Sequence, residues 1–134
     1  MSRWALFVDA GWLFAAGSVS ALGERIPRRD LDWDTDRLTD ALVERAGQLV
    51  PASAELLRTY WYDGSPNRLP IGDQQTIAAL PDVKLRLGRT ARDGQKGVDG
   101  LIIHDLITHA YRRTIDDAVV ISGDEDLLDA IESP

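Results

Sequence analysis

The sequence predicts an α/β fold, a three-layer α/β/α sandwich around a central, mostly parallel sheet of about four strands. Short apolar runs without helical period alternate along the chain with segments of helical period, which is typical of parallel strands joined by helical crossovers. Two of these runs, 5–8 and 118–121, lead into a small-residue turn that carries aspartate. Open α/β sheets place their functional sites at such strand ends.

Length and composition indicate one globular domain over residues 1–134. Hydrophobic residues make up 44% and charged residues 28% of the chain, which excludes a disordered protein. The absence of cysteine excludes disulfides, thiolate metal sites and a thiol nucleophile. No apolar run is long enough to span a membrane, and the start does not resemble a signal peptide. We therefore expect a cytoplasmic protein without a membrane partner.

The distribution of charge says more than the net charge of −7. Every ionisable residue of 115–134 is acidic, whereas 84–96 is rich in Lys and Arg. An acidic total argues against a protein that coats nucleic acid non-specifically. It is compatible with an enzyme that has an acidic metal pocket and a local basic rim.

The first strand and helix are expected near the amino end. Residues 5–8 are apolar and end at Asp9, and residues 12–16 then look helical. Residues 23–33 are polar, contain proline and alternate in charge, which predicts a loop. The order is therefore strand, carboxylate, turn, helix.

A second helix and strand follow. The apolar spacing predicts a helix over 36–48, capped by Asp34 or Thr35. Residues 56–62 are rich in β-formers and aromatics and predict a strand. The cluster 63–67 predicts a turn, which makes its first residue, an aspartate, a further and weaker site candidate at a strand end.

The next segments are a short helix over 73–80 and a strand over 83–89. The strand alternates strictly between apolar and mostly basic residues, so we expect an edge strand with one face buried and one facing water. Its outward charges can simply blunt that edge. Residues 90–97 are expected to form a loop that carries Arg92 and Lys96.

Residues 98–113 give the clearest helical pattern. Its apolar stripe is expected to begin at Asp99 and to continue through Ile102, Ile103, Leu106 and Ala110. A carboxylate aimed at a core is costly unless it is capped, paired or metal-bound, so Asp99 is a site candidate; the alternative is a first-turn acid that interacts with the helix dipole. Asp105, His104 and His109 lie off this stripe, which predicts surface histidines and an Asp105 that is solvated or paired with Arg112 or a neighbour.

The β-branched run 118–121 predicts a strand buried on both faces. Because the carboxyl ends of parallel strands lie along one edge, Asp9, Asp124 and Asp126 should meet there, and Asp99 can join them from its helix start. The alternative is that Asp124 only caps the following helix and that Asp126 only favours its first turn.

Converging carboxylates without cysteine or a well-placed histidine suit a hard cation, Mg²⁺ or Mn²⁺. Such an ion activates water and neutralises charge on a phosphoryl group. Nearby Lys96 and Arg92 could hold a phosphate or steady the departing oxyanion. The chain has no phosphate-binding glycine loop, no dinucleotide motif and no nucleophile elbow, so nothing points to ATP, NAD or acyl transfer.

Three segments in the right order resemble the NYN domains of the PIN-like nuclease superfamily. They are Leu-Phe-Val-Asp-Ala-Gly at 6–11, Lys-Gly-Val-Asp at 96–99 with Asp105, and Val-Ile-Ser-Gly-Asp-Glu-Asp-Leu at 120–127. The resemblance spans nearly the whole chain and implies a PIN-like, Rossmann-like sandwich and a metal-dependent ribonuclease. It implies that one or two divalent ions are held by Asp9, Asp99, Asp124 and Asp126. The expected substrate contacts are Lys96, Arg92, Ser122 and Trp12, and the expected substrate is RNA, single-stranded rather than duplex.

The chain departs from the family pattern in two ways. Many members have Asn where this chain has Trp12, which could instead stack on a base, although core packing is the commoner fate of such a tryptophan. The family also usually continues into another strand and helix, so we expect a domain truncated at its C-terminus, with its C-terminal strand missing. An exposed sheet edge would favour a homodimer.

Two other functions remain open. One is a non-catalytic RNA-binding or assembly module of the same fold, favoured by the acidic balance and the missing Asn. The other is a phosphoryl-transfer enzyme with Asp9 as nucleophile, which fits less well because Gly11 stands where a second aspartate is expected.

Overall fold

The structure is a computed structural model, which describes residues 2–23, 33–65, 68–89 and 96–123. Strands and helices alternate in this part of the chain, as the sequence predicts. The strands are β1 Arg3–Asp9, β2 Glu55–Ser65, β3 Val83–Arg89 and β4 Asp117–Ile121. The helices are α1 Ala10–Leu22, α2 Thr35–Gly47, α3 Asp73–Ala78 and α4 Lys96–Arg112.

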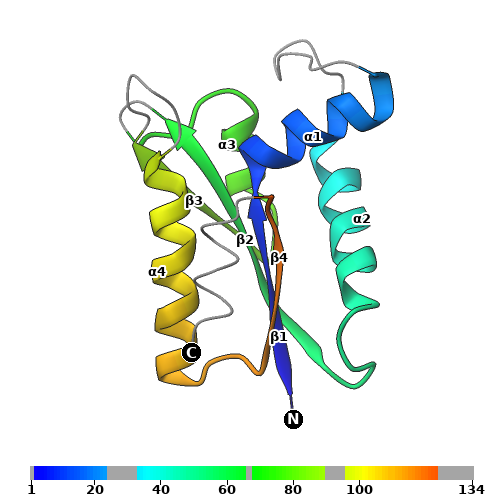
Figure 1. The fold of residues 1–134 in the computed structure, drawn as a ribbon, viewed down its shortest axis with the longest axis vertical. Helices are drawn as coiled ribbons and strands as arrows, with labels where there is room; N and C mark the ends of the chain where they lie inside the picture. The colour runs from blue at the N-terminus through cyan, green and yellow to red at the C-terminus, as the bar shows by residue number, and fades with distance from the viewer. Residues whose placement is uncertain (1, 24–32, 66–67, 90–95, 124–134) are drawn as a thin grey trace.

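The four strands form one parallel sheet in the order β3-β2-β1-β4. β1 lies inside the sheet, and every residue from Trp4 to Asp9 is buried. All strands point the same way, so their carboxyl ends share one edge, at the top of Figure 1. The predicted α/β class with a parallel sheet is therefore confirmed.

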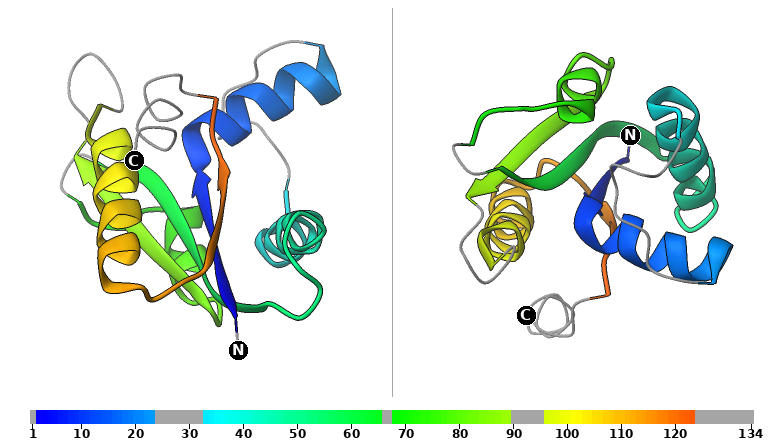
Figure 2. Two further views of the ribbon diagram at one scale, coloured as in Figure 1. Left: turned by 60° about the horizontal axis from the view of Figure 1, so that its bottom comes forward. Right: turned by 90° about the horizontal axis from the view of Figure 1, so that it is seen from above.

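Helices cover both faces of the sheet (Figures 1 and 2). On one face, Leu6, Val8 and Trp61 pack in a cluster with residues of α1, α2 and α3. On the other, Phe7 and its neighbours pack against α4, the single helix described on that side. The alternation of side chains along β1 thus supplies two cores, which is consistent with a three-layer sandwich.

Two predicted strands differ from the observed ones. β2 continues through Ser65, so the turn predicted from residue 63 is wrong for residues 63–65. These residues stay in the sheet because each has a partner on β3, such as Asp63 opposite Leu87. β4 is an outer strand of the described sheet, with no residue fully buried, so the prediction of a strand buried on both faces is also wrong.

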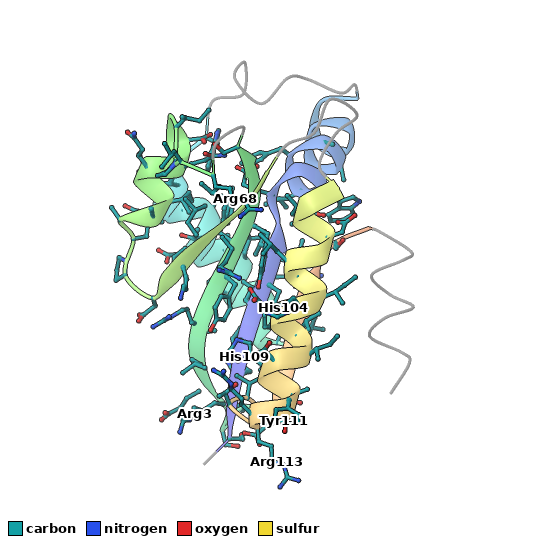
Figure 3. The ribbon with its side chains drawn as sticks, turned by 90° about the vertical axis from the view of Figure 1, so that its left-hand side faces the viewer. Arg3, Arg68, His104, His109, Tyr111 and Arg113 are labelled. Carbon is teal, nitrogen blue, oxygen red and sulfur yellow. The ribbon has the colours of Figure 1, made fainter. Side chains whose placement is uncertain are left out.

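The phase of α4 is rotated from the predicted stripe. Val98 and Ile102 are buried against the sheet, while Ala110 is exposed. The rotation turns Asp105 and His109, predicted to be at the surface, toward the sheet. His109 lies edge-on to Phe7 and Tyr60, with ring centroids 5.8 and 5.1 Å away (Figure 3).

The predicted edge strand 83–89 is confirmed as β3, with the predicted bounds. Its basic face does not simply meet water, however. Lys84 and Arg86 pair in register with Tyr60 and Tyr62, and Arg86 reaches α4. In the described part of the chain, no helix is long and apolar enough to cross a membrane.

Candidate functional site

The connections of the sheet create a switch point between β1 and β4. The chain leaves β1 for β2 through α1 and α2 on one face, and it reaches β4 from β3 through α4 on the opposite face. Ligands of open α/β sheets bind outside the carboxyl ends of the strands at such a point. Val8 pairs with Ile121 here, so the next residues along the chain are Asp9, which ends β1, and Ser122, which follows β4.

Asp9 is fixed at this point by its backbone and by its side chain. It is the last residue of β1, and α1 begins at the next residue, Ala10. Its Oδ1 accepts a hydrogen bond of 3.2 Å from the backbone N–H of Trp12, and the residue is only 7% exposed. The carboxylate therefore caps α1 and is held in one position at the strand end.

Trp12 does not enter the core. It is 41% exposed, whereas Phe14 of the same helix is buried against Trp33 and Trp61. The indole ring lies against the backbone of Gly123, just past β4. A Cβ at position 123 would lie 2.6 Å from Cε2 of that ring, so only glycine fits without moving it. Trp12 thus connects the ends of β1 and β4.

The other predicted site residues have different positions. Asp99 lies in the first turn of α4 and is half-buried, and α4 begins at the end of the sheet where the strands finish (Figure 1). Lys96 is the first residue of α4 and not part of a loop, and Ser122 follows β4 and is half-buried. Arg92, Asp124 and Asp126 lie outside the described residues.

The structure therefore brings Asp9, Trp12 and the Ser122–Gly123 segment together. Among residues 2–23, 33–65, 68–89 and 96–123, no group of three or more His, Asp or Glu side chains could hold a metal ion. The carboxylate donors of Asp9 and Asp99 are of the hard-oxygen type that Mg²⁺ and Mn²⁺ prefer.

Asp63, the weaker candidate, has a structural role. It is 2% exposed, and its Oδ1 accepts from the N–H of Gly64 at 2.9 Å. Its Oδ2 accepts from Nε2 of the buried Gln74 at 3.0 Å, and the same nitrogen donates to the Gly64 carbonyl at 2.9 Å. These bonds tie α3 to β2 and satisfy a carboxylate that would otherwise be costly to bury.

Asp105 connects α4 to the two neighbouring strands. Its Oδ2 accepts from the Tyr62 hydroxyl at 2.8 Å and from Arg86 Nε at 3.0 Å, and its Oδ1 accepts from Arg86 Nη2 at 3.1 Å. Of the three alternatives predicted for Asp105, solvation and pairing with Arg112 are wrong, and it pairs instead with Arg86, its neighbour on β3. The rotation of the helix turns Asp105 away from solvent, and its side chain is 13% exposed. We call Asp105, Arg86 and Tyr62 the α4 tie.

Burial and these bonds shift several pKa values. Burial and, after it, donation to Asp105 raise the pKa of Tyr62 far above its usual range, so the hydroxyl stays protonated. The hydrogen bond with Asp105 raises the pKa of Arg86. Burial against the aromatic residues lowers the pKa of His109. The network under α4 is therefore a neutral phenol and a fixed ion pair, which is suited to holding a helix.

Sequence reasoning missed the roles of Arg86 and Gly123. The pattern of β3 predicts Arg86 on a solvent-facing side, but its alternation with Leu85 and Leu87 also fits a face covered by α4. Gly123 was interpreted only as a break after β4. The sequence signal for its role is that a large residue, Trp12, follows β1 while a residue without a side chain, Gly123, follows the adjacent strand β4.

The fold is that of a doubly wound α/β protein, and Asp9 lies at its switch point. The family model for the NYN domain matches residues 3–134, and the chain therefore belongs to the NYN domain family, whose members have a nuclease-like fold. An uncharacterized protein y4oD of Sinorhizobium fredii (strain NBRC 101917 / NGR234) is 54% identical over 56 residues. That match covers 41% of this chain and 26% of the relative, so the chain spans only part of that protein. No solved structure matches the chain.

Proposed function

We propose that this chain is a divalent-metal-dependent endoribonuclease whose carboxylates hold Mg²⁺ or Mn²⁺. The residues proposed to hold the ion are Asp9, Asp99, Asp124 and Asp126. Family membership supports nuclease chemistry in general. The observation that carries the proposal is Asp9, a nearly buried carboxylate fixed at the end of an inner strand, beside the switch point.

Each side chain has a separate role in the proposed site. Asp9 is oriented by the N–H of Trp12, so its carboxylate does not have to be ordered when a cation binds. Asp99 approaches from the first turn of α4 and adds a second oxygen donor. A divalent cation bound there supplies an activated water and neutralises charge on the phosphodiester. Lys96, Arg92 and Ser122 are the proposed contacts to the substrate phosphates.

The test is cleavage of an end-labelled, mixed-sequence single-stranded RNA in Mn²⁺, Mg²⁺ or EDTA. Wild type is compared with Asp9→Asn and Asp124→Asn, and Asp40→Asn on the exposed surface of α2 is the control. Loss of one metal ligand should remove several kcal/mol of transition-state stabilisation, so the rate should fall by about 100-fold or more. The control should cleave like wild type.

A wild-type protein that binds metal and RNA but cleaves nothing would contradict the proposal. If that binding is also indifferent to Asp9→Asn and to EDTA, the chain is a non-catalytic RNA-binding module. A phosphoenzyme trapped on Asp9 would instead support the phosphoryl-transfer alternative.

A homodimer is a further proposal. Within the described residues, β3 and β4 are the outer strands of the sheet, and an outer strand can pair with another chain. Light scattering during gel filtration measures the assembly state, and a monomer across the accessible concentrations would contradict the proposal.

A further inference from the structure

The exposed indole of Trp12 is the feature that the proposed chemistry does not use. α1 places Ala10 and Phe14 in the core and leaves Trp12 41% exposed at the end of the sheet. Burying an aromatic ring of this size would contribute to stability, so its exposure is not explained by packing of the core. The ring is nevertheless not a loose surface group.

Two contacts fix the position of Trp12. Its backbone N–H donates to Asp9 at the end of β1, and its indole rests on Gly123 after β4. A Cβ at Gly123 would come within 2.7 Å of Cδ1 as well as 2.6 Å of Cε2, so position 123 must lack a side chain for the ring to lie there. A rigid aromatic surface therefore stands directly beside the carboxylate of the switch point.

This arrangement suits one chemical class of ligand. A flat heterocycle attached to a phosphate can stack on the indole while its phosphate lies toward Asp9 and a bound cation. Nucleobases of single-stranded RNA are such groups, and stacking on an aromatic side chain is tolerant of base identity. In a duplex the bases are already stacked and paired, so they cannot reach the ring without extrusion.

We propose that Trp12 stacks one unpaired base next to the phosphodiester that is cut, and that the protein thereby selects single-stranded RNA. The inference rests on the proposed ribonuclease function, because that function places a phosphate at Asp9. Trp12 is then a specificity residue. It takes no part in bond breaking.

The test measures binding separately from cleavage. The probe is a short fluorescent RNA of mixed sequence, used single-stranded, as a duplex, and in versions that carry one abasic nucleotide at each position in turn. Binding is measured by anisotropy in Ca²⁺, with the RNA recovered and shown to be intact. The variants are Trp12→Leu, Trp12→Phe and Gly123→Ala, and Tyr111→Leu is the matched control. Tyr111 is 88% exposed at the far end of α4, the end of the molecule that holds Arg3 at the start of β1 (Figure 3).

Trp12→Leu should weaken binding of single-stranded RNA by about 5- to 150-fold, the range for loss of one base–aromatic stack. Trp12→Phe should retain most of the affinity, and Tyr111→Leu all of it. Gly123→Ala should weaken binding as Trp12→Leu does, because its Cβ displaces the ring. One abasic position should weaken binding to wild type and have no further effect on Trp12→Leu.

Unchanged affinity in Trp12→Leu, equal losses for single strand and duplex, or the lack of any abasic position coupled to Trp12 would each overturn the inference. If Trp12→Leu does not fold, the abasic scan of wild type against Trp12→Phe decides, because no sensitive position in wild type means no stacked base. If the protein cleaves RNA but no abasic position is coupled to Trp12, the stacking proposal is refuted and the ribonuclease proposal stands. If an abasic position is coupled to Trp12 in binding but the protein cleaves no RNA, the ribonuclease proposal is refuted and the stacking proposal stands.

Discussion

Replacing Asp105 by Asn tests whether the α4 tie holds the helix on the sheet. Asn has the size of Asp but carries one acceptor oxygen and no charge. If its amide oxygen takes the place of Oδ2, it keeps the bonds from Tyr62 and Arg86 Nε. Its NH₂ group then faces Nη2 of Arg86, and because both groups are hydrogen-bond donors the bond between these two positions is lost.

The expected loss follows from these contacts. A hydrogen bond to a charged partner contributes about 1.5–3 kcal/mol. The Arg86 side chain is 33% exposed, so water screens the ion pair and recovers part of the loss. We expect Asp105→Asn to lower the free energy of unfolding by about 2 kcal/mol. At this chain length the melting temperature should fall by roughly 5–10 °C.

The assay is urea unfolding followed by circular dichroism, with Asp40→Asn as the control for the same chemical change on an exposed helix surface. A cycle with Arg86→Met should show a coupling of about 1–2 kcal/mol, since both variants remove the ion pair and the bond from Arg86 Nη2 to Asp105. A free energy of unfolding for Asp105→Asn within about 0.5 kcal/mol of that of the Asp40→Asn control would contradict the prediction, because exposed substitutions vary by that much.

Three further predictions concern the rest of the fold. Gln74→Leu should cost about 2–3 kcal/mol in urea unfolding because it leaves the buried Asp63 with one donor fewer; an unchanged midpoint would contradict this role. Asp34→Ala should cost about 1 kcal/mol, because Asp34 Oδ1 caps α2 by accepting from the N–H of Arg37 at 3.1 Å, and a smaller helical signal should accompany it. Burial holds the pKa of His109 below its ordinary value, against the opposing charge of Asp105, so the unfolded chain takes up the proton more readily. The stability from the neutral ring is therefore present above about pH 6.5 and is lost as the pH falls through the lower pKa of the folded state, so wild type should lose more stability than His109→Gln between pH 7.5 and 5.

The sequence allowed the parallel sheet and the position of Asp9 to be predicted because both depend on local signals. The run 5–8 has no helical period, and an aspartate follows it directly. The bounds of β3 were predicted correctly because Pro81 and Asp82 precede the alternating run and the alternation does not continue past Arg89. The cap of α2 was narrowed to Asp34 or Thr35 because the spacing from the apolar stripe is a short-range property, and the structure selects Asp34.

The remaining features depend on tertiary contacts. The apolar residues of α4 fit two helical phases that share Ile102, one that runs through Asp99 and Ala110 and one that runs through Val98 and Asp105. Arg86 and Tyr62, distant in sequence, select the second phase because they accommodate the carboxylate of Asp105. Similarly, Gly64 and Ser65 read as a turn and become a strand because β3 pairs with them.

The direct junction of β1 and α1 has a mechanical consequence. No linker residue separates Asp9 from the first residue of the helix, Ala10, and a hydrogen bond closes the junction at Trp12. Because no flexible residue lies between them, a rotation of α1 moves the carboxylate of Asp9 and the indole of Trp12 together. An added residue at this junction would turn Trp12 by about 100° around the helix axis and separate the two groups. The strand end and the helix start therefore form a single rigid part.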